Sequence, residues 1–405
     1  MRIAMVSEHA SPLAALGGPD AGGQNVYVAR LAAALAARGH EVTVHTRRDS
    51  PHLPERVRTP AGVVVEHVPA GPAQQVPKDH LLDYMPYFGR HLAHRWHAEP
   101  PDVAHAHYWM SGMASLIGAH DEPVPVVQTF HVLGTVKRRH QGRADSSPYE
   151  RVQVEKRIGR SAARTIATCG DEAVELTRLG VPAAQVAVVP CGVDVEAFRP
   201  GAPARGPVRQ QRHRLLAVGR LVRRKGFDEA IRALPAIPNT ELVIAGGPPQ
   251  KLVDTDPEAE RLRALARGLG VGDRVRFAGG VSHERMPNLI RSADAVVCTP
   301  RYEPFGMVPL EAMACGVPVL ATAVGGQPDT VADEETGLLL PPDDPDMIAS
   351  AARRLLARPT LRRRFGAAGR KRVLSRFTWS RVTDGVEQVY TQVSTSARIR
   401  TGAAS

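Results

Sequence analysis

The 405-residue chain lacks long apolar runs, paired cysteines and a high aromatic content. A transmembrane helix needs about 18 or more consecutive apolar residues, and no stretch reaches that length. The start, MRIAMVS, enters a strand pattern without a charged leader, so no signal peptide is expected. The four cysteines are widely spaced, which argues against a disulfide framework or a structural zinc and predicts a reducing, cytoplasmic location.

Lysine is also scarce, supplying six of the 52 basic residues, and this predominance of arginine is typical of a GC-rich, actinobacterial-like genome. The net charge is +11. Such a charge fits an anionic partner, such as a phosphorylated substrate, a membrane surface or nucleic acid, and it equally fits a solvated arginine-rich surface. Aromatic residues make up only 4% and offer no stacking platform, so no nucleic-acid partner is expected.

The chain alternates short β-branched runs with helical periods, the signature of parallel α/β layers. Strands are expected in the first half at 2–7, 41–46, 63–68, 102–107, 124–130, 165–169 and 186–190. In the second half they are expected at 214–219, 241–246, 274–279, 295–300, 318–323 and 336–340. The predicted fold class is α/β, with two Rossmann-like, doubly wound parallel sheets and a helical C-terminal tail.

The segment 198–212, FRPGAPARGPVRQQR, interrupts this alternation with three prolines, two glycines and four arginines, and it is predicted to be a linker. It separates an N-terminal domain over 1–197 from a C-terminal domain over 213–377. A last helix over 378–397 is expected to return to the first domain. Parallel sheets bind ligands at the carboxyl ends of their strands, so the cleft between the domains is the expected active site.

Two motifs in the second half carry charge at strand ends. In GRLVRRKG (219–226), Arg220 and Lys225 lie across a strand-to-helix turn, where both can converge on one phosphate group or simply be solvated. In YEPFGMVPLEAMACG (302–316), Glu303 follows a strand and Glu311 lies inside the next helix. Carboxylates there suit sugar hydroxyls, and Glu311 stands among apolar neighbours, a costly place for an idle charge.

The first half carries weaker signals. GGPDAGGQN (17–25) opens a helix directly after a strand, which favours an anion over a mere surface turn. His131 follows a buried-looking strand, although a lone histidine is more often structural. The segment 137–143, KRRHQGR, is the densest basic cluster and is read as a loop that contacts an anionic acceptor or a membrane, or is merely solvated.

Together these segments resemble the retaining GT-B glycosyltransferases of family 4, which use nucleotide sugars, over about 1–395. EPFGMVPLE matches the E-x7-E motif of that family, and GRLVRRKG matches its phosphate-binding Arg/Lys turn. DAGGQNVYV, HYWMSG and the TFH…VK segment look most like the branch that holds D-inositol-3-phosphate glycosyltransferases and sucrose-phosphate synthases. The resemblance implies transfer of a hexosyl group from a UDP sugar to a small phosphorylated or polyol acceptor.

The resemblance also implies roles for single residues. Arg220 and Lys225 would neutralise the leaving diphosphate, and His131 would lie beside the 6-hydroxyl of the donor sugar. The residues implied to be catalytic are His131, Glu303, Arg220 and Lys225. Those implied to bind the nucleotide sugar are Gly22, Gly23, Arg220, Lys225, Glu303, Phe305, Gly306 and Glu311, with Glu303 on the sugar hydroxyls and Glu311 on the ribose. The implied acceptor contacts are Asn25, Lys78, Tyr108 and Arg151. Members of that branch have a threonine that binds phosphate directly after the histidine. This chain has Val132 at that position and lacks this phosphate ligand.

A front-side mechanism without a metal or cofactor follows from the same resemblance, and no DxD-type or His/Asp cluster is expected to hold a cation. Three alternatives stay open. An NADP-dependent oxidoreductase would use Arg47 and Arg48, but the glycine spacing is not GxGxxG and the paired glutamates would have no role. The second alternative is a basic protein that binds nucleic acid or membranes. The third is a membrane-associated lipid glycosyltransferase of the same fold. The oligomeric state is not predicted.

Overall fold

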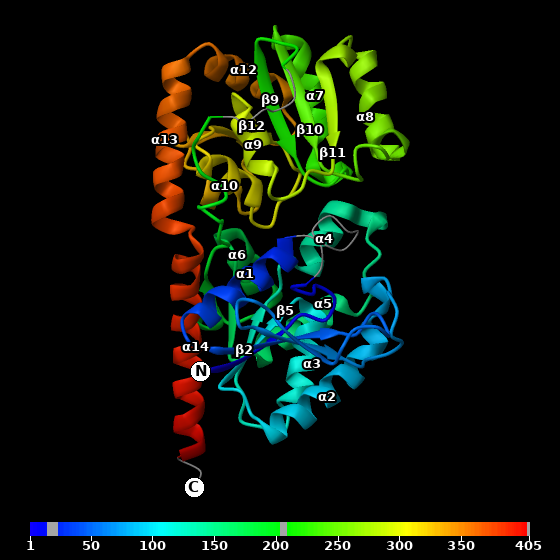
Figure 1. Ribbon diagram of the computed structural model, residues 1–405, viewed down its shortest axis with the longest axis vertical. Coiled ribbons are helices and arrows are strands. Elements are labelled where there is room, and N and C mark those ends of the chain that lie inside the picture. The colour runs from blue at the N-terminus through cyan, green and yellow to red at the C-terminus, as the bar shows by residue number, and fades with distance from the viewer. Residues whose placement is uncertain (14–22, 203–208, 403–405) are drawn as a thin grey trace. The chain divides into compact units, whose positions relative to one another are not determined.

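A computed structural model describes residues 1–13, 23–202 and 209–402, and it divides into two compact units (Figure 1). Unit 1 comprises Met1–Pro190 together with the chain from Trp379 onward, and unit 2 comprises Cys191–Thr378. Each unit is built on one largely parallel sheet with helices between the strands. The predicted fold class, two parallel α/β sheets with a helical C-terminal region, is confirmed.

The described part of unit 1 has eight strands in the order β3-β4-β2-β1-β5-β6-β7-β8. Their bounds are β1 (Arg2–Val6), β2 (Glu41–Arg47), β3 (Arg56–Arg58), β4 (Val64–Val68), β5 (Val103–His107), β6 (Val126–Thr129), β7 (Arg164–Ala167) and β8 (Val186–Val188). All neighbours are parallel except β3, which pairs antiparallel with β4. Strand β3 was not predicted, because its three residues, RVR, have no apolar run.

Helices cover this sheet and connect its strands. They are α1 (Gly23–Ala37), α2 (Met85–Ala98), α3 (Trp109–Gly118), α4 (Gly134–Gln141), α5 (Arg151–Ser161), α6 (Gly170–Leu179) and α14 (Trp379–Gly402). The interpretation of 137–143 as a loop is wrong, since most of it belongs to α4. That helix ends at Gly142, whose φ of 53° stops it.

Helix α14 packs on unit 1 through polar contacts as well as apolar ones. The Tyr390 hydroxyl lies 2.7 Å from His105 Nδ1, deep in the unit. At the surface, Glu387 bonds both Arg38 and His40, which follow α1. The last helix is therefore part of unit 1.

The described part of unit 2 has six strands, all parallel, in the order β11-β10-β9-β12-β13-β14. They are β9 (His213–Val218), β10 (Thr240–Ala245), β11 (Val275–Gly279), β12 (Ala295–Cys298), β13 (Val319–Thr322) and β14 (Gly337–Leu340). The helices are α7 (Phe227–Ala233), α8 (Pro257–Gly268), α9 (Met286–Arg291), α10 (Met307–Ala314), α11 (Gln327–Thr330), α12 (Pro345–Leu356) and α13 (Pro359–Arg376). Aliphatic side chains of β9, β10, α7, α8 and α12 form one buried cluster.

The division of the chain falls earlier than the predicted linker. Unit 2 begins at Cys191. Phe198, the first residue of the predicted linker, is fully buried, and its carbonyl accepts a 2.8 Å hydrogen bond from Arg370 Nη1 within unit 2. Residues 203–208 of that segment lie outside the described residues. Over the described ranges, no helix combines the length and apolar character needed to cross a membrane.

Candidate functional site

The turn after β9 is held against the end of β12 in unit 2. Gly226 has a φ of 62°, and a Cβ there would collide with the carbonyl oxygen of Thr299. Thr299 Oγ1 in turn donates a 2.8 Å hydrogen bond to the Gly226 carbonyl. Only glycine allows this approach, so the GRLVRRKG turn is fixed beside the YEPFG segment.

This approach brings Lys225 and Glu303 together. Lys225 Nζ lies 2.5 Å from Glu303 Oε2, and both side chains are 17% exposed. Arg224 Nη1 lies 3.6 Å from the same oxygen. Burial alone would raise the pKa of Glu303, but the Lys225 and Arg224 charges outweigh it and hold that pKa below its ordinary value. The pair is therefore ionised, with one lysine and one carboxylate at the carboxyl edge of the sheet.

Arg220 and Glu311 complete this group in different ways. Arg220 is exposed on the same turn, and its charge also contributes to the lowered pKa of Glu303. Glu311 lies on α10, and its carboxylate forms no hydrogen bond or ion pair with any described residue. Burial raises the pKa of Glu311 to about 7, although Lys225 opposes the shift. The two glutamates of the motif thus differ in charge near neutral pH.

The remaining predicted residues of unit 2 shape the same edge. Gly306, with a φ of 95°, begins α10, and Phe305 is buried beside Phe377. Sequence reasoning missed the turn after β13. There Gly326 donates a 3.0 Å hydrogen bond to the Glu303 carbonyl, and Gln327 is fully buried, its amide without a partner among the described residues. The sequence signal that could have identified this turn is its GGQ tripeptide after a strand, because the same tripeptide occurs at 22–24, where α1 begins.

In unit 1, His131 stands at the end of a row of histidines. Its backbone has a φ of 63°, and its Nε2 lies 3.2 Å from His107 Nδ1. The rings of His107 and His105 are 4.1 Å apart, and His105 Nε2 bonds Thr129. Tyr27 of α1 packs its ring edge on His131.

Burial lowers the pKa of these histidines. It lowers the pKa of His131 to about 3 and that of His105 to about 3, with neighbouring histidines adding to the shift. The pKa of His107 is also well below its ordinary value, mainly through burial. Each imidazole is therefore neutral at pH 7. His131 acts there as a neutral hydrogen-bonding group rather than as a cation.

Two of the predicted acceptor residues meet inside unit 1. Arg151 is fully buried, with its guanidinium 5.1 Å from the Tyr108 ring centre and its Nη1 3.2 Å from the Tyr108 hydroxyl. Its other nitrogens bond Glu155 at 2.7 Å and the Val132 carbonyl at 2.7 Å. Arg151 thus ties α5 to the turns after β5 and β6, and its role at an acceptor stays a prediction.

The other two predicted acceptor residues lie on separate elements. Asn25 is buried in α1, and its Nδ2 donates to the Ser11 carbonyl at 3.1 Å. Lys78 begins a short 3₁₀ turn, Lys78–His80, beside a cavity of about 650 Å³ that is lined by 74–77, 79–80, 82–84 and 148. Of the predicted glycines, Gly23 begins α1, and Gly22 lies outside the described residues.

The basic cluster 137–143 is largely engaged within unit 1. Lys137 Nζ lies 2.9 Å from Asp145, and Arg139 makes a two-pronged pair with Glu175 at 2.9 and 3.1 Å. Arg138 donates to the carbonyls of Pro148 and Tyr149. These cations are therefore not merely solvated, because their ion pairs and hydrogen bonds connect α4 to neighbouring segments of unit 1.

Sequence reasoning missed Glu8 and His9, which follow the end of β1 after Ser7. Glu8 is buried, with Oε1 2.7 Å from His9 Nδ1, and its Oε2 accepts from the Ser111 hydroxyl. The His9 ring meets Tyr108 edge-on at 4.8 Å. The one feature of the sequence that could have identified these two residues is their position after the carboxyl end of a central strand.

In the parts of the chain that the structure describes, no group of three or more His, Cys, Asp or Glu residues is placed so that it could hold a metal ion. None of the four cysteines forms a disulfide, and all four are buried. The groups available for chemistry are therefore the polar side chains that follow the carboxyl ends of the strands in each unit. Unit 2 has an ionised Lys–Glu pair with an arginine, and unit 1 has neutral histidines.

Two family models match the chain. "Glycosyltransferase Family 4" matches residues 21–197, and "Glycosyl transferases group 1" matches residues 202–372. The D-inositol 3-phosphate glycosyltransferase of Acidothermus cellulolyticus is 38% identical over 411 residues, covering 96% of this chain and 90% of the relative. That of Nocardiopsis dassonvillei is 38% identical over 404 residues, covering 96% and 94%.

Solved structures are similar as well. The sucrose-phosphate synthase of Thermosynechococcus elongatus matches with a TM-score of 0.88 and 35% identity, covering 98% of this chain and 99% of that one. Anabaena Alr3699/HepE matches with a TM-score of 0.74 at 19% identity, covering 97% and 100%, which is a likeness of fold alone.

The raised pKa of Glu311 predicts a pH-dependent loss of stability. Between about pH 4.5 and 7 the folded chain binds a proton at Glu311 that the unfolded chain has released, so stability falls as pH rises through this range. Glu311→Gln removes the titration. The melting temperature of the variant relative to wild type should rise by roughly 1–3 °C from pH 5 to pH 8, measured by calorimetry.

Glu260→Gln is the matched control, because Glu260 is an exposed glutamate on α8. Its melting temperature relative to wild type should not change with pH in the same way. A pH-independent difference for Glu311→Gln would contradict the raised pKa.

Proposed function

The chain belongs to the family 4 glycosyltransferases and has their GT-B fold, and from this premise we propose that it is a retaining hexosyltransferase that uses a UDP sugar. The observation that carries the proposal is the Lys225–Glu303 pair beside Arg220 at the carboxyl edge of unit 2. The two cations of this group suit a nucleoside diphosphate, and its carboxylate suits a sugar hydroxyl.

In the proposed reaction the donor's diphosphate gains negative charge as its bond to the anomeric carbon breaks. Arg220 and Lys225 would stabilise that charge without reorganising, because the turn at Gly226 already fixes their backbone. The acceptor hydroxyl attacks the anomeric carbon from the side on which the diphosphate leaves. The departing phosphate oxygen takes the hydroxyl proton, so the configuration is retained and no protein nucleophile is needed.

Each glutamate has a separate proposed role. Ionised Glu303 accepts hydrogen bonds from donor sugar hydroxyls, while one of its oxygens stays on Lys225. Glu311, with its raised pKa, meets the ribose hydroxyls. In unit 1, His131 is neutral and can donate or accept a hydrogen bond with the 6-hydroxyl of the donor sugar.

The acceptor in this proposal is a small phosphorylated molecule. Two relatives are named for D-inositol 3-phosphate and the similar solved structure for sucrose phosphate, so phosphate-bearing compounds recur. Lys78 is partly exposed, and the next two residues of its 3₁₀ turn, Asp79 and His80, line a cavity. No cofactor or metal is proposed. The cytoplasm is the proposed location, because four buried cysteines without disulfide bonds suit a reducing compartment.

The donor proposal predicts a large loss of turnover in Lys225→Ala. Removing one electrostatic stabiliser of the leaving group should lower kcat by about 10²-fold or more, in an assay of UDP release with the acceptor present. Arg220→Ala should behave alike.

Arg223→Ala is the control for this test, because Arg223 is exposed on the same 3₁₀ turn and takes no part in the pair with Glu303. It should keep nearly wild-type kcat. Equal losses in Arg223→Ala and Lys225→Ala would argue for general damage to the turn, and full activity in Lys225→Ala would defeat the assignment.

Activity should also survive chelation. Since the positive charge at the diphosphate comes from side chains and helix ends, turnover in excess EDTA should stay close to that in its absence. The measurement is initial rate after dialysis against EDTA, with and without added magnesium or manganese. Complete loss that either metal restores would overturn this part of the proposal.

The acceptor proposal predicts a selective effect of Lys78→Ala. Losing a charged hydrogen bond to phosphate should raise the acceptor KM by roughly tenfold or more, while the donor KM stays nearly constant. Lys156→Ala, on α5 of the same unit, is the control. Equal turnover of a phosphorylated acceptor and its dephosphorylated form by wild type would rule out an anionic acceptor.

A further inference from the structure

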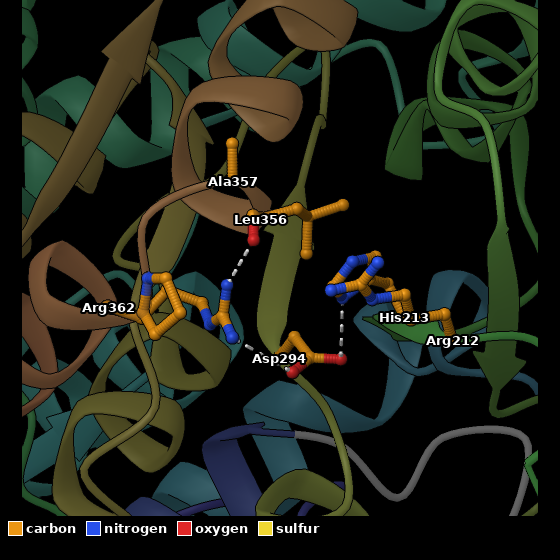
Figure 2. A pocket seen from close by; sticks show the side chains of 7 residues that line it. Arg212, His213, Asp294, Leu356, Ala357 and Arg362 are labelled. Carbon is orange, nitrogen blue, oxygen red and sulfur yellow. Dashed lines mark hydrogen bonds and ion pairs between the residues drawn. The ribbon is translucent and has the colours of Figure 1, made fainter.

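Unit 2 has a polar cavity at the amino-terminal ends of its strands, opposite to the ends that are followed by Lys225 and Glu303. It has a volume of about 370 Å³, and Figure 2 shows its lining side chains, among them Arg212, His213, Asp294 and Arg362. His213 begins β9 and Asp294 directly precedes β12, whereas the Lys225 and Glu303 turns follow these same strands. A six-residue strand spans about 20 Å, so the cavity is distinct from the proposed donor site.

Positive charge exceeds negative charge at this cavity. Asp294 is the one acidic residue among the described lining residues. It accepts from Arg209 Nη1 at 2.9 Å and from the Arg214 backbone N–H at 2.9 Å, and Arg362 Nη2 lies 3.7 Å away. Arg212 is exposed, and its guanidinium has no hydrogen bond or ion pair with a described residue. The guanidinium groups of Arg209 and Arg362 therefore share a single carboxylate, and Arg212 adds a third positive charge.

A helix terminus adds to this field. Pro359, which lines the cavity, begins the 18-residue helix α13, whose first turn has no acidic residue and no side-chain cap. The positive end of the helix dipole therefore faces the cavity without compensation. Arg362 is held in place there, because its Nη1 donates to the carbonyls of Leu355 and Leu356 at the end of α12.

We propose that this cavity is a second ligand site of unit 2 and that its ligand is a small phosphate-bearing anion. Guanidinium groups with planar donors match phosphate oxygens, and the uncapped helix adds backbone N–H donors. The volume lies near the lower end of the roughly 300–1,000 Å³ range of ligand pockets, which suits a small molecule. The site is independent of the sugar-transfer proposal, because it shares no residue with it.

His213 provides a reporter inside the site. Burial and the neighbouring Arg362, Arg212 and Arg209 lower its pKa, although Asp294 opposes them. A bound phosphate adds negative charge beside the ring and should raise that pKa, so that binding takes up a proton.

The test is titration of the full chain with inorganic phosphate, followed by the NMR signals of the His213 ring. Those signals are assigned by their loss in His213→Gln. We expect a saturable shift and an upward change of the His213 pKa. The apparent affinity should fall about tenfold in Arg212→Ala and in Arg362→Ala, and it should rise in Asp294→Asn, where the competing carboxylate charge is gone.

Arg363→Ala is the matched control, because Arg363 is exposed on α13 next to Arg362 and does not line the cavity. It should bind phosphate like wild type. Lys225→Ala separates the two sites, since it should leave the His213 response unchanged. Arg212 is exposed, so its variant keeps the test open if Arg362→Ala does not fold. Absence of a saturable His213 shift, or equal affinity in Arg212→Ala and Arg363→Ala, would overturn the proposal.

Discussion

The close approach of Gly226 to the Thr299 carbonyl is the constraint on which the candidate donor site depends. It locks the turn after β9 to the end of β12, two strands that lie side by side in the sheet. Lys225 and Glu303 are 78 positions apart in the chain, and this contact makes them a 2.5 Å ion pair. A side chain at position 226 would separate the turns and leave a partly buried carboxylate without its cation, an arrangement that burial penalises strongly.

The histidine row of unit 1 differs from this ion pair, because its imidazole rings are packed against one another rather than against a carboxylate. The row His105, His107 and His131 stays neutral, since burial makes each proton costly. Tyr390 of the last helix closes the row by bonding His105. The C-terminal segment therefore supports the interior from which His131 emerges, although it lies far from it in the sequence.

The sheets were predictable because apolar runs of β-branched residues report buried parallel strands directly. Strand β3 lacked such a run, and α4 was hidden in a basic segment whose cations pair with Asp145 and Glu175 from other elements. The E-x7-E and Arg/Lys motifs identified one edge of unit 2. Glu8 and Gln327 were not predicted, because single residues at strand ends acquire meaning only when neighbouring strands are brought together.

The environment of the two motif glutamates explains why their spacing matters. The charge of Lys225 lowers the pKa of both glutamates, but one ammonium can neutralise only one carboxylate at contact distance. The turn places the Lys225 ammonium against Glu303. Glu311, placed in α10 without a hydrogen bond among the described residues, keeps its proton until about pH 7. One carboxyl group is then purely an acceptor while the other can also donate. Two environments that push the pKa values of similar groups apart divide their roles, and here they leave Glu303 charged and Glu311 largely protonated below about pH 7.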